Sequence, residues 1–290
     1  MRLPDKSAPW RLGWRILWRL RRPAEGSVLG LARLFVEGVQ RARPLRRTWV
    51  WVGSSLAPCL DHSMQRHLPP GQRERSDFPR FGLTQFARRF PREPSRFDLD
   101  VVGEVDEDLH LRDALAGLPR AELAADFHCV TTWTRRGLRW GGVRFVDFYE
   151  QVLLPQARPH DGATLVGLRG QDGARTGLPL KDLLAPEVLL ADTLDGEPLS
   201  VAHGAPARLV APAHYAYKSV KHLSRIEFMA GGADYAASGF RFMDHPRARV
   251  EFEERGRGLP GWLLRLLYRP LIRGTVGRFA RGLEDCERLG

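Results

Sequence analysis

A single cysteine, Cys129, stands inside the run D-F-H-C-V-T-T-W between Asp126 and Trp133. A deprotonated cysteine is a nucleophile and a soft ligand for transition metals. The other two cysteines, Cys59 and Cys286, lie far from it in the sequence, and the chain has no C-x-x-C pair. Neither a four-ligand zinc site nor a disulfide framework is therefore predicted. An unpaired cysteine also packs well as a small apolar residue, so Cys129 alone leaves a structural role open.

Three further runs follow the cysteine run along the chain. The first is W-G-G-V at 140–143, the second is G-E-P-L-x-x-x-H-G-A-P-x-R-L-V at 196–210, and the third is Y-x-Y-K-S-V-K-x-L-x-x-I-E at 215–227. In this order, the four runs resemble the oxidoreductase molybdopterin-binding domain of the sulfite oxidase family. The likeness is to the bacterial branch, which includes the catalytic subunit of the methionine-sulfoxide reductase. It covers roughly residues 69 to 230.

The resemblance implies a molybdenum-molybdopterin cofactor, in which one pyranopterin dithiolene and one protein thiolate hold the metal. Cys129 takes the thiolate position, as metal ligand and catalytic residue. One cysteine is enough because the pterin supplies two more sulfurs, and a coordinating thiol is deprotonated by the charge of the ion. The implied activity is that of a molybdopterin-dependent oxidoreductase. It moves an oxygen atom and two electrons to or from a small sulfur- or other oxo-substrate.

The motif at 196–210 places His203, Gly204 and Arg208 close together. A pterin with its phosphate is planar, polar and anionic, so its pocket needs hydrogen-bond donors, cations and a glycine where the backbone comes close. The resemblance implies that His203 and Arg208 contact the pterin or its phosphate. His128, which precedes the metal ligand, is a further candidate for cofactor binding. A structural hydrogen bond to the backbone is an equal alternative for His128.

The third motif implies a second cofactor-binding stretch, Ser219, Val220 and Lys221. A basic residue taken alone is more often solvated, so the assignment of Lys221 depends on its motif. The chain also departs from its relatives. Arg80 and Phe81 stand where relatives carry an Asn- or His-containing loop over the pterin, and Gly170 replaces a common Ser or Thr. These departures leave open a cofactor-free binding protein that keeps the fold.

The partners follow from what the sequence lacks. It has no haem-attachment C-x-x-C-H, no flavin motif and no G-x-G-x-x-G after a strand, so electrons must pass to or from a separate protein or small carrier. Arg135, Arg136 and Arg139 would attract an anionic substrate if they face the site. An exposed turn is the more common arrangement for such a cluster.

The net charge of +11 is concentrated at one end, because residues 1–48 hold 12 Lys and Arg against 3 Asp and Glu. Trp10, Trp14 and Trp18 recur every four residues beside a matching arginine stripe. On a helix this pattern either docks on the domain or makes peripheral membrane contact. No nucleic-acid partner is expected. Because no apolar run reaches about 18 residues and no signal-peptide core is evident, we expect a cytoplasmic protein.

Short apolar segments alternate with turns rich in Pro and Gly, which favours an α+β domain with a mixed sheet over a doubly wound parallel sheet. We expect a partly helical basic extension over 1–68, a molybdopterin-binding catalytic domain over 69–235, and a helical basic tail over 236–290. The central strands are expected at 96–105, 121–130, 164–168, 188–191, 207–212 and 224–229. Short helices are expected within 109–118, within 143–154 and from 178. In the tail, Pro270 must kink or end a helix.

Overall fold

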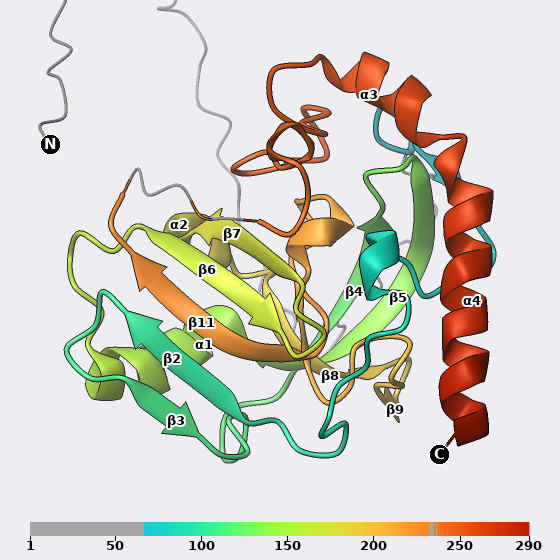
Figure 1. The fold of residues 1–290 in the computed structure, drawn as a ribbon. Helices are drawn as coiled ribbons and strands as arrows, with labels where there is room; N and C mark the ends of the chain where they lie inside the picture. The colour runs from blue at the N-terminus through green and yellow to red at the C-terminus, as the bar shows by residue number, and fades with distance from the viewer. Residues whose placement is uncertain (1–66, 232–234, 236, 290) are drawn as a thin grey trace, which may run out of the picture. The chain divides into compact units, whose positions relative to one another are not determined.

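The computed structural model describes residues 67–231, 235 and 237–289. The helices expected near the N-terminus therefore lie outside the described residues. The rest is mixed α+β, with two mixed sheets and short helices (Figure 1). The described chain begins with a turn at 69–72, in which the amide of Gln72 donates to the carbonyl of Pro69.

The first sheet has six strands in the order β1-β5-β8-β10, with β4 beside β5 and β9 beside β8. Only the β1–β5 pair is parallel among these pairs. The strands are β1 (Arg73–Glu74), β4 (Ala121–His128), β5 (Trp133–Arg144), β8 (Leu189–Leu194), β9 (Glu197–Pro198) and β10 (Arg208–Val210).

The second sheet has five strands in the order β3-β2-β11-β6-β7, in which β2 and β11 run parallel. The strands are β2 (Leu99–Gly103), β3 (Leu109–Leu111), β6 (Leu165–Gly170), β7 (Arg175–Pro179) and β11 (Leu223–Met229). The short helices are η1 (Thr84–Phe86), α1 (Phe145–Phe148), η2 (Tyr149–Ala157), α2 (Leu180–Leu183), η3 (Ala216–Lys218) and η4 (Arg241–Met243). Two longer helices, α3 (Gly261–Tyr268) and α4 (Leu271–Leu289), complete the chain.

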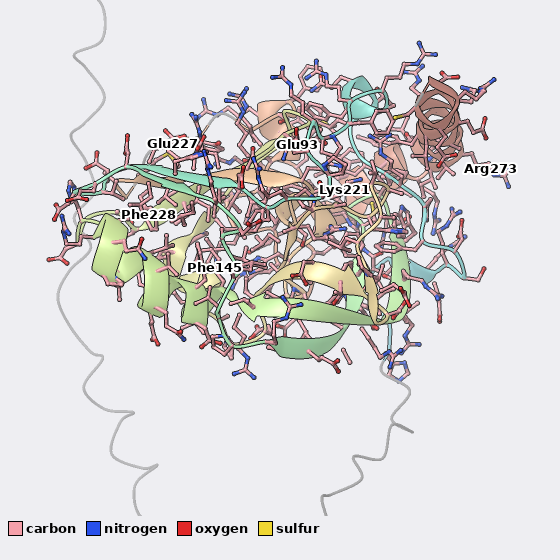
Figure 2. The ribbon with its side chains drawn as sticks, turned by 90° about the horizontal axis from the view of Figure 1, so that it is seen from below. Glu93, Phe145, Lys221, Glu227, Phe228 and Arg273 are labelled. Carbon is pink, nitrogen blue, oxygen red and sulfur yellow. The ribbon has the colours of Figure 1, made fainter. Side chains whose placement is uncertain are left out.

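The largest apolar core joins the two sheets. Phe228 of β11 and Phe145 of α1 are fully buried in it, together with residues of β2, β5, β6, β8 and β10 (Figure 2). A second cluster around Trp140 and Leu189 packs against β4. A third joins Phe86 of η1 to Phe279 of α4, so that α4 runs along one side of the domain (Figure 1). The core therefore fixes the two sheets and ties the C-terminal helix to them.

Several expectations about individual elements need correction. The helix expected within 109–118 is wrong, because turns follow β3 there. Arg135, Arg136 and Arg139 do not form an exposed turn: they belong to β5, whose buried Leu138 and Trp140 flank an exposed Arg139. The strand β7 was not expected. Apart from the short η4, the described part of the tail is helical only from Gly261 onward, and its two longer helices are separated at Pro270, as predicted.

Candidate functional site

One pocket, with a volume of about 330 Å³, receives residues from both sheets and from α3 and α4. Six of the seven site residues expected from the sequence line it. They are Cys129, His203, Arg208, Ser219, Val220 and Lys221. The seventh, His128, is not part of the lining. Segments that are far apart in the chain thus meet around Cys129.

The turn between β4 and β5 presents Cys129 to the pocket. The Cys129 amide donates to the carbonyl of Trp133 at 2.8 Å, and the Thr132 amide donates to the carbonyl of Cys129 at 3.1 Å. Thr132 has φ of 88°, a left-handed conformation that a β-branched residue rarely adopts. Strained backbone of this kind concentrates at functional sites because the surrounding structure must enforce it.

The Cys129 thiol is buried, with 5 % of the residue exposed. Burial raises the pKa of the thiol, while a hydrogen bond from the Thr131 hydroxyl and the positive charges of Arg255 and Arg75 partly offset this rise. The Cys129 Sγ lies 3.1 Å from the Thr131 Oγ1. The thiol therefore keeps its proton at neutral pH unless a cation binds to the sulfur.

His128 stabilises the cysteine turn from outside the pocket lining. Its Nδ1 lies 2.9 Å from the Thr134 hydroxyl, which donates to the Gln72 Oε1 at 3.1 Å. The Gln72 Nε2 in turn donates to the Cys129 carbonyl at 3.0 Å. Burial lowers the pKa of His128, so the ring is neutral and donates from Nδ1 to Thr134. In this structure His128 acts on the cysteine turn through two side chains and does not face the pocket.

Arg255 holds the other side of the same turn. Its guanidinium donates to the carbonyl of Val130 and, at 3.0 Å, to the carbonyl of Pro70. It also pairs with Glu253 at 3.1 Å and lies over the Tyr215 ring. The side chain is fully buried. The sequence did not identify Arg255 as a residue of the site, because its partners are backbone carbonyls from distant segments.

His203 and Arg208 form a rigid corner of the pocket. The His203 Nε2 donates to the carbonyl of Phe78 at 2.9 Å, and its ring stacks on that of Phe78. Arg208 donates to the carbonyls of His203 and Ser219, both at 2.9 Å. Burial lowers the pKa of Arg208 to about 9, which still leaves the guanidinium charged at neutral pH.

Gly204 allows this corner to close. It has φ of 117°, and a Cβ there would lie 3.1 Å from both the Arg208 Cβ and the Lys221 Cγ. A side chain would therefore push the two cations apart. The sequence predicted a glycine where the backbone comes close to a bound cofactor. In this structure the groups that come close to Gly204 are two side chains of the protein, those of Arg208 and Lys221.

The stretch Ser219 to Lys221 follows η3. The Ser219 hydroxyl accepts from the Ala211 amide at 3.2 Å, and the Val220 carbonyl accepts from the Leu209 amide at 3.0 Å. Lys221 reaches the carbonyl of Phe81 at 3.3 Å. Burial, reinforced by the charges of Arg208 and Arg80, lowers the pKa of Lys221 to about 7. An anion bound beside Lys221 would favour the charged form of its side chain.

The two departures from the family pattern have structural explanations. Arg80 is buried, and its guanidinium donates to the carbonyls of Phe86, Ala87 and Arg89, so it organises the loop before β2. Phe81 lines the pocket. A Cβ on Gly170 would lie 2.3 Å from the carbonyl oxygen of Lys221. Glycine is required at 170 because the backbone of the third motif occupies the space of a side chain.

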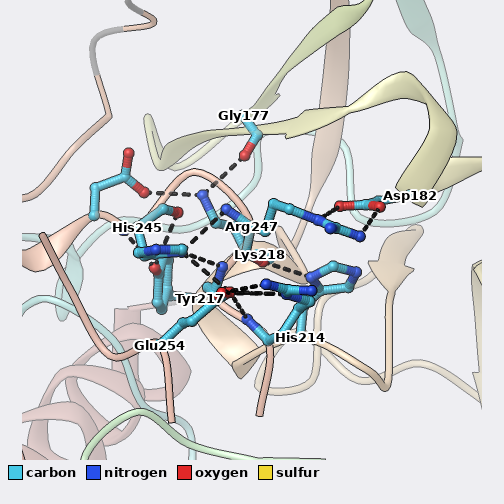
Figure 3. A network of polar contacts seen from close by, with 11 residues as sticks. Gly177, Asp182, His214, Tyr217, Lys218, His245, Arg247 and Glu254 are labelled. Atoms are coloured by element: carbon cyan, nitrogen blue, oxygen red, sulfur yellow. Dashed lines mark hydrogen bonds and ion pairs between the residues drawn. The ribbon is translucent and has the colours of Figure 1, made fainter. Parts of the chain in front are cut away.

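A polar network holds the wall of the pocket formed by Tyr217 and Asp244 (Figure 3). The buried ammonium of Lys218 donates to the Asp244 carboxylate at 2.9 Å and to the carbonyl of Gly177 at 2.8 Å. The Tyr217 hydroxyl accepts from the His245 amide at 2.9 Å. Lys218 therefore ties the wall to β7 and is already neutralised by Asp244.

The C-terminal helices supply a wall that the sequence analysis did not assign to the site. Tyr268, Leu271, Thr275 and Phe279 line the pocket. The last three recur every four residues, the spacing that puts side chains on one face of a helix. This periodicity was the available signal, but it did not reveal which surface the face would cover. Phe279 lies 5.9 Å from the Lys221 ammonium and stacks near Phe81.

Comparison with known proteins agrees with this arrangement. The family profile described as the oxidoreductase molybdopterin binding domain matches residues 87–235. The chain belongs to this family and is a molybdopterin oxidoreductase of the sulfite oxidase type.

The chain is 36% identical to the uncharacterized oxidoreductase YuiH of Bacillus subtilis over 162 residues, which are 56% of this chain and 78% of YuiH. It is 29% identical over 188 residues to the protein-methionine-sulfoxide reductase catalytic subunit MsrP of Xanthomonas campestris, covering 57% of this chain and 58% of MsrP. Among solved structures, the sulfane dehydrogenase SoxCD of Paracoccus pantotrophus aligns with a TM-score of 0.42 at 23% identity, over 53% of this chain and 44% of that one.

The described residues suit the cofactor of the family. Three cations lie in or beside the pocket, and burial lowers the pKa of each: Arg80, Arg208 and Lys221. The carboxylate of Asp172 acts on the charges of Arg80 and Lys221. Burial raises the pKa of Asp172, which weakens it as a counter-ion. The indole N–H of Trp133 is buried without an acceptor among the described residues. Excess donors and cations fit an anionic, acceptor-rich ligand, and a metal ion bound at Cys129 would deprotonate its thiol.

Proposed function

We propose that the pocket holds a molybdenum-molybdopterin cofactor, with Cys129 as the protein ligand to the metal, and that the chain acts on a small oxo-substrate. When bound, the cofactor supplies transfer of an oxygen atom together with two electrons. The main observation in support of this proposal is that Cys129, Arg208 and Lys221 line the same pocket.

The role of Cys129 follows from its surroundings. Burial keeps the thiol protonated in the metal-free protein, so the proton leaves only when the sulfur meets a cation. The strained turn at Thr132 and the hydrogen bond from Gln72 hold the backbone of Cys129 in place. The turn therefore presents the sulfur without further rearrangement of the chain.

Arg208 and Lys221 bind the anionic part of the cofactor in this proposal. Their charges are held in a buried setting where the attraction to a phosphate is stronger than in water. Gly204 keeps the two side chains close together. His203, whose two ring nitrogens are engaged by Phe78 and Ser200, forms part of the pocket wall beside the ligand.

The substrate side of the pocket favours a neutral oxo group, such as a sulfoxide, over an oxyanion. Of the cations whose charge reaches Cys129, Arg75 pairs with Asp77 at 2.7 Å and Arg255 is bound by backbone carbonyls and Glu253, while Lys221 is assigned here to the cofactor. Apolar side chains, among them Val130 and Phe127, line the pocket. The name of the relative MsrP, a protein-methionine-sulfoxide reductase catalytic subunit, agrees with this preference. A separate protein or small carrier would exchange the electrons.

The test compares wild type with Cys129→Ser and with Cys286→Ser, all made in a host that synthesises the pterin cofactor. Cys286 is only partly buried, on α4, and serves as the matched control. We expect close to one molybdenum per chain in wild type and in Cys286→Ser. Both should oxidise a reduced viologen dye with methyl p-tolyl sulfoxide, and Cys129→Ser should lose this turnover. Well-folded wild type without molybdenum would contradict the proposal and favour a cofactor-free binding protein.

A further inference from the structure

Helix α3 and the first residue of α4 expose a set of large apolar side chains, of which only Leu271 lines the pocket. Trp262, Leu266, Leu267 and Leu271 are 54%, 56%, 54% and 54% exposed. Exposed apolar patches of this kind on a folded domain mark surfaces that contact another molecule or a membrane. Leu271 also lines the pocket, so the exposed face adjoins the pocket wall.

The exposed face lies opposite the side of α3 that is packed into the protein. Leu264 and Tyr268 are buried and lie one helical turn apart. At 3.6 residues per turn, Trp262 and Leu266 fall on the other side of the helix, and the exposed Leu267 lies between that side and Leu264. The buried side already anchors α3, so the exposed residues are not needed for its attachment.

Arginines outnumber acidic residues around this face. Residues 255–283 contain seven arginines and no Asp or Glu. Arg265 and Arg269 flank the apolar face, with Arg265 3.5 Å from Glu253. Arg273 is exposed and projects outward from α4 (Figure 2). Apolar side chains that include a Trp, bordered by arginines, form the surface that binds the boundary between lipid head groups and acyl chains.

We propose that α3 and the first turn of α4 form a docking surface for an anionic lipid bilayer. Trp262, Leu266 and Leu267 enter the boundary region, while Arg269 and Arg273 contact acidic head groups. A second copy of this chain is a poorer partner, because a self-complementary contact would bring identical arginine clusters together. The proposal does not depend on the bound cofactor.

The test measures partition of the full chain onto sedimenting vesicles, either pure phosphatidylcholine or a mixture with phosphatidylglycerol. The variant Leu266→Glu/Leu267→Glu is compared with Leu154→Glu, which alters an exposed leucine on η2. The basic segment at 1–48 is present in every variant, so its contribution is common to all. We expect the double variant to lose binding to the mixed vesicles by at least about tenfold. Leu154→Glu should bind as wild type does.

A second variant, Arg269→Gln/Arg273→Gln, tests the charge. It should weaken binding to the mixed vesicles several-fold and reduce the dependence of binding on salt. Unchanged partition of both variants would overturn the proposal. So would a wild-type dimer in solution that the double variant dissociates, because a second copy would then cover the face. Thermal unfolding shows whether each variant is folded. If Leu266→Glu/Leu267→Glu does not fold, vesicle binding of Arg269→Gln/Arg273→Gln tests the proposal by itself.

Discussion

At Cys129, burial and hydrogen bonding act in opposite directions on one thiol. Burial raises its pKa, and the hydroxyl of Thr131 with the charges of Arg255 and Arg75 lowers it. Burial is the largest effect, so the metal-free thiol is neutral and poorly reactive. Several residues that hold Cys129 in position could not be recognised from the sequence. Gln72 is one of them, because it lies in none of the four motifs.

The hydrogen bonds from His128 through Thr134 to Gln72 stabilise the turn that carries Cys129. Thr134→Val keeps the shape of the side chain but leaves the buried Gln72 Oε1 without the hydroxyl that now donates to it. We expect a loss of about 1–3 kcal/mol in the free energy of unfolding, measured with urea. Ser224→Ala removes a single exposed hydrogen bond and should change stability by less than about 0.5 kcal/mol. Equal stability of Thr134→Val and wild type would contradict this role.

Lys221 should make anion binding depend on pH. Its folded pKa of about 7 lies below its ordinary value, so the side chain is charged at pH 6 and largely neutral at pH 8. Sulfate, which does not titrate in this range, should therefore bind metal-free protein more tightly at pH 6, with proton uptake near pH 8. His222, with a pKa of about 4, is neutral throughout, and burial lowers the pKa of His203, which reduces its charge in this range.

Isothermal titration calorimetry in two buffers with different ionisation enthalpies measures both the affinity for sulfate and the protons taken up. Lys221→Gln should bind more weakly at pH 6 and lose the dependence on pH. A sulfate affinity that is the same at pH 6 and pH 8 in wild type would argue against a titrating Lys221.

At the scale of elements, α4 closes the pocket by packing on η1. A Cβ on Gly282 would lie 2.2 Å from the carbonyl oxygen of Ala87, so glycine allows the helix to approach. We expect Gly282→Ala to cost about 1–3 kcal/mol of stability and to speed alkylation of Cys129 by iodoacetamide in metal-free protein. Followed in a Cys59→Ser/Cys286→Ser background, which leaves Cys129 as the single cysteine, the reaction reports opening of the α4 wall.

Gly277→Ala is the matched control on the same helix. A Cβ there meets nothing within 4 Å, so the substitution should raise stability by up to about 1 kcal/mol through helix propensity alone. Its rate of alkylation should equal that of the parent. If both alanine variants behave alike, close packing at Gly282 is not what holds α4.

The positions of several central strands along the chain could be predicted from sequence because each carries a compact apolar run. The expected strands at 121–130, 164–168 and 224–229 correspond to β4, β6 and β11. The long strand β5 was missed because glycines and arginines interrupt its alternation. The contribution of α4 to the pocket could not be predicted, since an amphipathic helix reveals its apolar face without revealing what that face covers.

At the scale of the whole molecule, Arg255 connects the cysteine turn to the tail and to the segment before β1. Arg255→Met removes the donors that now bind the carbonyls of Val130 and Pro70. We expect a loss of about 3 kcal/mol in the free energy of unfolding. Arg278→Met, at an exposed position on α4, should change it by less than about 0.5 kcal/mol. Similar urea midpoints for the two variants would contradict a connecting role for Arg255.

The most direct measurement of the central claim is X-ray absorption at the molybdenum edge of the loaded protein. Wild type and Cys286→Ser should show the same number of sulfur ligands to the metal. Cys129→Ser, if it retains the metal, should show one sulfur fewer. If Cys129→Ser instead keeps the wild-type number of sulfur ligands, Cys129 does not bind the metal and the proposed site is wrong.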